Sequence, residues 1–488
     1  MSKFFSNRRN NEPAELSLNP LSRRNFLKWS GGCGALSSTA VLSQLLNLQL
    51  TQSAVADQAD GSDYKALVCV FLLGGVDSFN VVAPHVQSEY DDYAAIRSNL
   101  ALPREELKPI NVDIANPSSR TLGLHKGMEK MQLLYNAGNA AVVANVGSLV
   151  FPTTKANYDT VKLPLGLFSH SDLIQHWQTS VPQSRSQVTG WGGRMADLLS
   201  STTNGNPNIS MNMALGSLNI FQTGNDVVPY VVNSNGATSL YGYGSNNVRD
   251  RIYTRLINDM YPSVADDALG QIYSDLLQRT LAKTKKVSID AALEFNNATS
   301  ADTSITFPST SLGDKLKMVA KTINGRSTIG QGRQIFFVSA GGWDHHDEVL
   351  VNQEGMLPMV SDAIDAFYQE TEAMGVSDCV TTFTASDFGR TLTSNGNGSD
   401  HAWGGNHFVV GGAVKGGKVY GNYPESLAPD NNQDVGRGRL IPTTSVDEYN
   451  AELAMWFGIA NNQDLEDVLP NIRNFYAGGA STGPLGFL

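Results

Sequence analysis

Cysteine is scarce in this sequence, with three residues in 488. That number excludes both a disulfide framework and a zinc site built from cysteine thiolates. Cys69 and Cys379 lie in apolar runs typical of strands, which predicts buried thiols. The two can form a disulfide only if their strands are neighbours with suitable side-chain directions. Burial also argues against a reactive cysteine nucleophile.

Basic tracts are missing as well, and the formal net charge is -11. Residues 1–56 hold six Lys or Arg and two Asp or Glu, so the remaining chain is more acidic still. An acidic surface argues against non-specific nucleic-acid binding, and we expect no nucleic-acid partner. An anionic substrate would have to be held locally, by a metal and a few Arg or Lys side chains.

The sequence also lacks a long uninterrupted hydrophobic run. Residues 29–50 are only weakly apolar, and Gly, Ser, Gln and Asn interrupt them, which makes a stable membrane span a poor interpretation. The motif SRRNFLK at 22–28 precedes this run, and the small residues Ala54 and Ala56 follow it as a cleavage site. This pattern predicts a twin-arginine signal peptide over residues 1–56 rather than a membrane anchor. The mature bacterial protein would then be periplasmic or secreted, with the twin-arginine translocation machinery as a partner.

What is present favours an α/β fold. Apolar runs at 66–73, 140–146, 334–338 and 379–383 alternate with amphipathic segments, which predicts a mainly parallel sheet sandwiched by helices. We expect residues 57–488 to form this domain, with an inserted cap region around 200–311. The Asn-, Ser- and Gly-rich composition of residues 200–247 motivates the insertion. Near the C-terminus, Ser445 and Glu448 have the spacing of a helix capping box.

Carboxylates and imidazoles follow the predicted strands. Asp77 comes after the first apolar run, Asp344 and His346 after the third, and Asp387 after the fourth. Open α/β sheets bind ligands at the carboxyl ends of their strands, so we expect these groups to converge. Asp77 alone is equally well explained as a turn residue that caps a short helix.

His401 and His407 lie in a Gly- and Asn-rich loop that follows these strands. Loops at strand ends often carry ligands. The sequence therefore predicts a site for one or two divalent cations, with Zn²⁺, Mn²⁺, Mg²⁺ and Ca²⁺ all compatible. The predicted ligands are Asp77, Asp344, His346, Asp387, His401 and His407. We expect His345 to face away from this site or to bind a second ion.

Three further residues are candidates for catalysis. Ser169 stands at a predicted helix N-terminus, where free N–H groups stabilise an oxyanion or phosphate; the alternative is a plain N-cap. His170 is the next residue and the stronger functional candidate, whereas His176 is predicted to be structural. Arg390 is placed to clamp an anionic oxygen, or alternatively to pair with Asp387 for structure.

These motifs together resemble a family catalogued as domain of unknown function 1501, whose members are exported bacterial proteins related to the alkaline phosphatase and sulfatase superfamily. The resemblance covers essentially the whole mature chain. It rests on the motifs GGxDSFN at 74–80, SHxDxxxxW at 169–177, TGWxGR at 189–194, GGWDxH at 341–346, SDFGRT at 386–391 and DHxWGGxHFVxGG at 400–412.

The resemblance implies a phosphate- or sulfate-ester hydrolase with a metal centre at the carboxyl edge of the sheet. Asp77 is similar to the superfamily's first-strand Asp, and His407 to its last His. Phe388 stands where the superfamily usually has His, so either His401 substitutes for it or one metal is lost. The sulfatase motif Cys-x-Pro-x-Arg is absent, which disfavours a formylglycine sulfatase. The implied nucleophile is Ser169 or Ser78.

We therefore expect an exported, metal-dependent hydrolase that acts on a small anionic ester or a decorated polysaccharide. The alternative is a non-catalytic metal-binding or polysaccharide-associated protein that retains the fold.

Overall fold

The computed structural model describes residues 64–116, 118–239, 243–244, 247–260, 276–479 and 482–488. The predicted signal peptide lies outside these ranges. Among the helices in the described ranges, none combines the length and apolarity that crossing a bilayer requires.

A nine-stranded sheet forms the centre of the domain, in the order β13-β5-β12-β9-β1-β8-β6-β7, with β14 also paired to β5. Only β12 runs antiparallel to its neighbours in this sheet; the other pairings are parallel. The mainly parallel sheet is therefore confirmed. The strands are β1 (Lys65–Leu72), β5 (Ala140–Gly147), β6 (Asn212–Leu215), β7 (Tyr230–Val232), β8 (Arg333–Ala340), β9 (Val380–Ser386), β12 (Gly405–Val410), β13 (Val419–Gly421) and β14 (Thr444–Ser445).

Two smaller sheets accompany it. The first pairs β2 (Val82–Pro84), β4 (Thr121–Leu124) and β3 (Lys108–Asn111), and the second is the β10–β11 hairpin of Arg390–Ser394 and Ser399–His401. The helices are α3 (Ser78–Val81), α4 (Gln87–Arg97), α5 (Glu129–Asn136), α6 (His170–Thr179), α7 (Trp191–Thr203), α8 (Val248–Met260), α10 (Leu276–Ala298), α11 (Ser311–Asn324), α12 (Arg326–Ile329), α13 (Val349–Ala373), α14 (Val446–Phe457) and α15 (Asn462–Val468).

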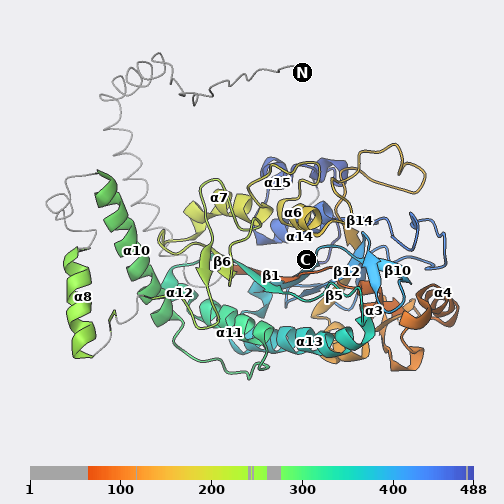
Figure 1. Cartoon of the computed structure of the whole chain (residues 1–488), viewed down its shortest axis with the longest axis horizontal. Coiled ribbons are helices and arrows are strands. Elements are labelled where there is room, and N and C mark those ends of the chain that lie inside the picture. The colour runs from red at the N-terminus through yellow and green to blue at the C-terminus, as the bar shows by residue number, and fades with distance from the viewer. Residues whose placement is uncertain (1–63, 117, 240–242, 245–246, 261–275, 480–481) are drawn as a thin grey trace, which may run out of the picture. The chain divides into compact units, whose positions relative to one another are not determined.

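Helices cover both faces of the sheet (Figure 1). Successive strand residues point to opposite faces, so each central strand contributes to two cores. On β1, Val68 and Val70 belong to the core that includes residues of α11 and α13. Cys69 and Phe71 belong to the other core, beneath α6, α7 and α14. Burial on both faces explains why these strands are continuous apolar runs.

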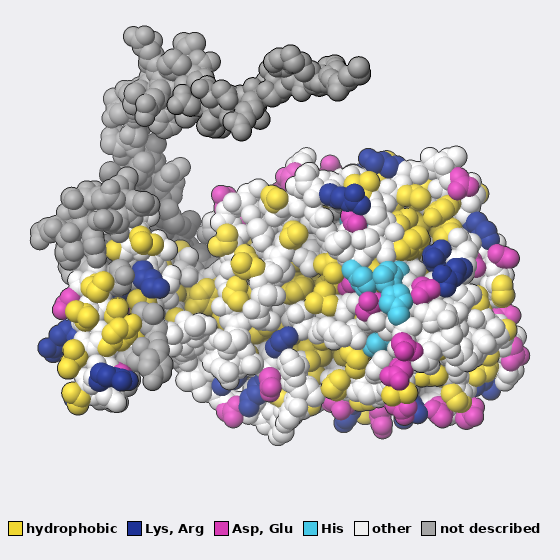
Figure 2. Space-filling view, in the orientation of Figure 1, with side chains coloured by type: hydrophobic (Ala, Val, Ile, Leu, Met, Phe, Trp, Pro, Cys, Tyr) yellow, Lys and Arg dark blue, Asp and Glu magenta, His cyan; other side chains and the backbone are white. Residues whose placement is uncertain are grey.

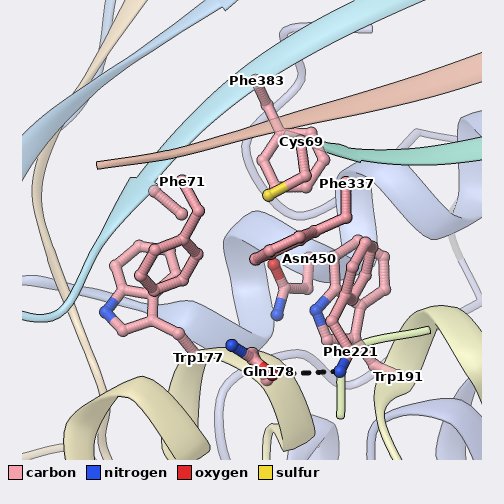
Figure 3. Close-up of a pocket in the computed structure, with 10 residues that line it drawn as sticks. Cys69, Phe71, Trp177, Gln178, Trp191, Phe221, Phe337, Phe383 and Asn450 are labelled. Atoms are coloured by element: carbon pink, nitrogen blue, oxygen red, sulfur yellow. Dashed lines mark hydrogen bonds between the residues drawn. The ribbon is translucent and has the colours of Figure 1, made fainter. Parts of the chain in front are cut away.

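The second core contains a small aromatic-lined cavity (Figure 3). Phe71, Phe337 and Phe383 reach it from the sheet, and Trp177 and Trp191 from the helices. Gln178 of α6 accepts hydrogen bonds from the backbone N–H groups of residues 220 and 221. These hydrogen bonds join α6, whose first residue is His170, to the loop between β6 and β7.

Both cysteines of the described chain are free thiols. Cys69 is buried as predicted, whereas Cys379 is only half-buried. Their strands are neighbours, but Cys69 lies opposite Phe383 in the β1–β9 register. Cys379 precedes β9 by one residue, so the offset along the strands prevents a disulfide.

The predicted capping box is confirmed: Ser445 and Glu448 cap each other at the start of α14. Within the predicted insertion, β6 and β7 extend the main sheet at its edge. The boundaries of a cap region around 200–311 stay a prediction, and residues 261–275 lie outside the described chain.

The first prediction concerns Gly74, at the turn after β1, where φ is +122°. A Cβ atom there would lie 2.4 Å from the backbone N of Asp344. Gly396 has φ +125°, with nothing within 4 Å of its Cβ position. Both Gly→Ala changes put alanine at nearly the same unfavourable φ, but only Gly74→Ala adds a clash. We expect Gly74→Ala to lower the free energy of unfolding by about 1–3 kcal/mol more than Gly396→Ala, measured by urea denaturation. Equal losses would contradict the close packing of the two turns.

The second prediction concerns acid stability. His125 is buried, and its Nδ1 accepts a hydrogen bond from the Gly127 N–H at 3.0 Å. Burial, with the charge of Lys126, lowers the pKa of His125 to about 4. Between pH ~6.5 and about 4, His125 is protonated in the unfolded chain but neutral in the folded chain. The free energy of unfolding therefore falls as the pH drops. The contribution of His125 to the free energy of unfolding is complete above pH ~6.5. Between that pH and about 4, this contribution falls by about 1.4 kcal/mol per pH unit.

The matched variant is His125→Asn, because Asn keeps a capping acceptor but does not titrate. Denaturation between pH 4.5 and 7.5 should give a shallower pH slope for this variant, whatever its absolute stability. An unchanged slope would show that His125 is already protonated in the folded state.

Candidate metal centre

The turn after β8 carries Asp344 to the carboxyl edge of the sheet. Gly342 adopts φ +98°, and the N–H of the buried Trp343 donates to the Leu73 carbonyl at 3.1 Å. These contacts join the end of β8 to the end of β1. With Trp343 buried, the Asp344 side chain points outward and remains 46% exposed.

His170 reaches the same edge from α6. Its Nδ1 lies 2.7 Å from Oδ2 of Asp387, the residue that directly follows β9. The other oxygen of Asp387 accepts from the Gly74 N–H at 3.0 Å. The Nε2 atom of His170 lies 3.4 Å from Asp344 Oδ2. The ends of β1, β8 and β9 are therefore linked through two carboxylates and one imidazole.

Two further imidazoles complete the group. The Nε2 atoms of His346 and His401 lie 2.8 Å apart, and they are 3.1 Å and 3.4 Å from Asp344 Oδ1. The ligand atoms of His170, Asp344 and His401 all lie within 4.8 Å of one another. We call His170, Asp344, His346 and His401 the histidine cluster. Figure 2 shows histidine side chains gathered on the exposed surface, with acidic groups beside them.

The partners of each Nδ1 atom indicate where the ring protons are. His401 Nδ1 lies 2.7 Å from the Phe168 carbonyl, which only accepts, so this nitrogen carries the hydrogen. His346 Nδ1 faces Asp400 Oδ1 at 3.1 Å, and His170 Nδ1 faces Asp387. With the hydrogen on Nδ1, each of these three rings, when neutral, has its lone pair on Nε2. The Nε2 atoms point towards Asp344.

The Nε2 atoms of His346 and His401 are within hydrogen-bonding distance of each other, at 2.8 Å. If both rings carry their hydrogen on Nδ1, the facing lone pairs repel, and a proton or a shared metal cation removes that repulsion. Histidines that donate their other N–H to a carboxylate or carbonyl are the usual arrangement around a bound metal. His170, Asp344 and His401, the group whose ligand atoms lie within 4.8 Å of one another, offer imidazole and carboxylate donors, which Zn²⁺ accepts, and His346 lies beside them. The residues present therefore fit a divalent metal.

The charge states suit ligands as well. Burial opposes ionisation of Asp344, but the hydrogen bond and charge of Arg390 outweigh it and hold its pKa below the ordinary value. Burial, with the nearby positive groups, lowers the pKa of His401. At neutral pH these groups are thus an anionic carboxylate and a neutral imidazole, the forms that bind metals.

Asp387 and Asp400 contact imidazoles of the histidine cluster without belonging to it. Burial raises the pKa of Asp387, in the absence of a metal, despite its bonds from Gly74 and His170. Burial also opposes ionisation of Asp400, but hydrogen bonds from Asn395, Arg437 and His346 lower its pKa to about 2. The predicted ligand Asp387 is therefore placed to orient His170 through its Nδ1.

Two predicted ligands lie outside the cluster. The Asp77 side chain is buried and accepts from Arg97 at 2.6 Å and Ser399 at 2.8 Å. His407 is buried, with its ring 4.8 Å from that of Trp177 and 6.2 Å from that of Tyr449. Burial lowers the pKa of His407 to about 3. The structure therefore places Asp77 in a buried ion pair and His407 among aromatic rings, both apart from the cluster.

Arg390 is not placed as an anion clamp, because its side chain is completely buried. Its guanidinium donates to the carbonyls of Gly74, Gly75 and Ser399, and it also pairs with Asp344. The structure therefore gives Arg390 a positioning role, although its partner is Asp344 rather than the Asp387 considered from the sequence.

The two serine candidates differ. Ser78 is buried, and its hydroxyl accepts from the Asn406 N–H at 2.9 Å, which leaves no access for a substrate. Ser169 is the N-cap residue of α6, but its hydroxyl makes no capping hydrogen bond and instead lies 3.2 Å from Ser171 Oγ. Ser169 is half-buried and precedes His170 directly, so it remains the candidate nucleophile.

Phe388, which replaces the expected His, supports the cluster by packing. Its ring centroid lies 4.8 Å from that of His170 and 4.6 Å from that of His401. His345 is buried away from the cluster next to Trp343. Sequence reasoning missed Asp400 and the Phe168 carbonyl as partners of the imidazoles; the position of Asp400 directly before His401 was the available signal.

A family model described as "Protein of unknown function (DUF1501)" matches residues 64–448. The chain belongs to this family. A twin-arginine translocation signal matches residues 20–40, so this family member is exported by that pathway to the periplasm or beyond. No curated protein matches it.

Several solved structures are similar to this DUF1501 chain at low identity. The PsFucS1 sulfatase from Pseudoalteromonas sp. is 9% identical with a TM-score of 0.32, over 84% of this chain and 71% of that one. The lipoteichoic acid synthase LtaP from Listeria monocytogenes is 10% identical with a TM-score of 0.32, over 86% and 81%. Ps i-CgsB in complex with k-i-k-neocarrahexaose is 11% identical with a TM-score of 0.31, over 87% and 78%.

The third prediction tests the support of His170 by Asp387. Asp387→Asn removes the charged acceptor at Nδ1 and should weaken Zn²⁺ binding by about 10- to 100-fold, measured by competition with a chromophoric chelator. The control is Asp172→Asn. Asp172 lies in α6, the helix that carries His170, and it pairs with the exposed Arg185 instead of an imidazole. We expect its Zn²⁺ affinity to match that of the wild type. Equal affinities for all three proteins would contradict the orienting role of Asp387.

Proposed function

We propose that this exported protein is a metal-dependent hydrolase of phosphate or sulfate esters. The observation that carries the proposal is the orientation of three imidazole Nε2 atoms towards one carboxylate, each imidazole held by a separate acceptor at Nδ1. Such an arrangement is typical of a metal centre. The motif resemblance to an ester-hydrolase superfamily gives the reaction class.

Exposure of the cluster supports catalysis over a purely structural role. Side-chain exposure is 46% for Asp344, 45% for His346, 33% for His170 and 24% for His401. A substrate can therefore reach these groups from solvent, and an open surface accommodates a small ester as well as a decorated polysaccharide. A divalent metal, Zn²⁺ or alternatively Mn²⁺, Mg²⁺ or Ca²⁺, would polarise an ester oxygen and lower the pKa of bound water.

The chain's own residues have separate roles in this proposal. Asp387, Asp400 and the Phe168 carbonyl keep the three rings in one tautomer and orientation. Arg390 keeps Asp344 anionic. Ser169 stands at the N-terminus of the ten-residue helix α6, where N–H groups stabilise an anionic oxygen. Either its hydroxyl or a water molecule acts as the nucleophile.

The second candidate is a non-catalytic metal-binding protein, and one observation favours it. The cluster offers three imidazoles and a carboxylate, and four protein ligands would fill a tetrahedral zinc site, as structural sites do. In that case the metal would stabilise the fold, and removal of the metal would lower the melting temperature without any loss of turnover.

The fourth prediction separates these functions. Purified mature protein should contain a divalent metal by elemental analysis and release phosphate or sulfate from aryl esters in a chelator-sensitive way. His401→Ala should lose metal and reduce turnover by at least about 100-fold, since it removes a ligand and outer-shell changes alone cost about 10- to 100-fold. His407→Phe, which keeps an aromatic ring in the core, should retain both. Bound metal with no activity on aryl phosphates, aryl sulfates or phosphodiesters would favour the non-catalytic alternative.

A further inference from the structure

The loop of residues 434–440 places two arginine side chains beside the histidine cluster. Arg437 pairs with Oδ2 of Asp400, whose Oδ1 lies 3.1 Å from His346 Nδ1. Arg439 donates from Nε to the His401 carbonyl at 3.4 Å. Arg437 is therefore connected to the His346 imidazole through Asp400, and Arg439 contacts the backbone of His401.

The backbone of this loop is held in an unusual conformation. Gly436, Arg437 and Gly438 have consecutive positive φ values of 105°, 64° and 68°. For a residue with a side chain, the left-handed region costs roughly 1–2 kcal/mol. Strain of this kind is concentrated at functional sites, where the surrounding structure maintains it. The surrounding structure therefore maintains an unfavourable backbone conformation at Arg437, and that conformation fixes where its side chain lies.

Several contacts keep the loop in place. The buried carboxylate of Asp434 accepts from the N–H groups of Gly436 at 2.7 Å and Gly438 at 2.9 Å. The Gly438 carbonyl accepts from the Leu392 N–H at 3.1 Å, and the Arg437 carbonyl from Thr393 Oγ1 at 2.9 Å. A Cβ atom on Gly438 would lie 2.4 Å from that of Leu392. The loop is therefore fixed against β10, and its arginines are preorganised.

Both guanidinium groups retain hydrogen-bonding capacity. The Arg437 side chain is 48% exposed, and in the part of the chain that the structure describes, Asp400 is the only group shown to accept from it. The Arg439 guanidinium lies 4.9 Å from the ring centroid of Phe168, which restricts its orientation. Figure 2 shows basic side chains next to the surface histidines.

We propose that Arg437 and Arg439 form an anion subsite that binds the tetrahedral phosphate or sulfate group of the substrate beside the histidine cluster. This inference rests on the proposed function and deepens it. A planar guanidinium binds such oxyanions through two parallel hydrogen bonds. The remaining N–H groups of Arg437, which is paired with Asp400, and the guanidinium of Arg439 would hold the anionic group locally, in place of the buried Arg390.

The fifth prediction is tested by titration calorimetry of inorganic phosphate, and separately of sulfate, into the metal-loaded full-length mature protein. Arg437→Asn removes the charge while Asn tolerates positive φ, and Arg439→Gln removes the second charge. Each variant should bind the preferred anion about 10- to 100-fold more weakly, the range expected for one hydrogen bond to a charged group. Arg437→Lys should recover part of the affinity. Arg249→Gln, at an exposed arginine of α8, is the control and should behave as the wild type.

Metal content measured on every variant separates the possible results. A loss of anion affinity with metal retained supports the subsite, and the stronger of the two anions identifies the ester class. Unchanged anion affinity in both arginine variants overturns it. Loss of metal in Arg437→Asn also overturns it, because Arg437 would then act only by orienting His346 through Asp400.

The proposed function can fail separately. If the wild type binds no metal, the proposed function is wrong, and the subsite is then judged in the metal-free protein. There the same arginine-dependent loss of anion binding must appear. Its absence would overturn the subsite as well.

Discussion

One buried guanidinium connects the strand ends on which the candidate site is built. Arg390 donates to the carbonyls of Gly74 and Gly75 after β1 and pairs with Asp344 after β8. It also donates to Ser399 at the start of β11. A buried charge is costly unless it is paired and fully hydrogen-bonded, so these partners are strongly constrained in position. Because Asp344 is one of them, the geometry of the histidine cluster depends on this interior contact.

The cluster itself shows how a rigid interior supports an exposed site. Phe388 packs beneath two imidazole rings, and the acceptors at Nδ1 fix the ring orientations. The outward atoms are left to solvent. Preorganised ligands of this kind lose little conformational freedom when a cation binds, which favours binding. The strained loop at Arg437 extends the same principle to an anion, since β10 and Asp434 maintain its conformation.

Local sequence patterns were sufficient for the fold and for part of the site. The central strands are continuous apolar runs because both faces are buried, and the residues just beyond β8 and β9 were correctly expected at a shared edge. Asp344, His346 and His401 converge there. The pattern was insufficient to place Asp77 and His407, because the ion pair with Arg97 and the edge-on contact with Trp177 join segments that are distant in sequence. His170, predicted to be catalytic, lies in the cluster with its Nε2 3.4 Å from Asp344 Oδ2, and its catalytic role stays a prediction.

The sequence by itself determined the export signal, the family, the parallel α/β architecture and the residue types at the strand ends. Each of these depends only on the order and spacing of residues that are close together in the chain. Only the tertiary structure decided which imidazoles share one carboxylate, which arginine is buried and which is exposed. His170 and Asp387 are 217 residues apart and still form a hydrogen bond. Side chains this far apart in sequence meet only after the strands and helices have packed, and packing selects partners by shape and burial that no local pattern records.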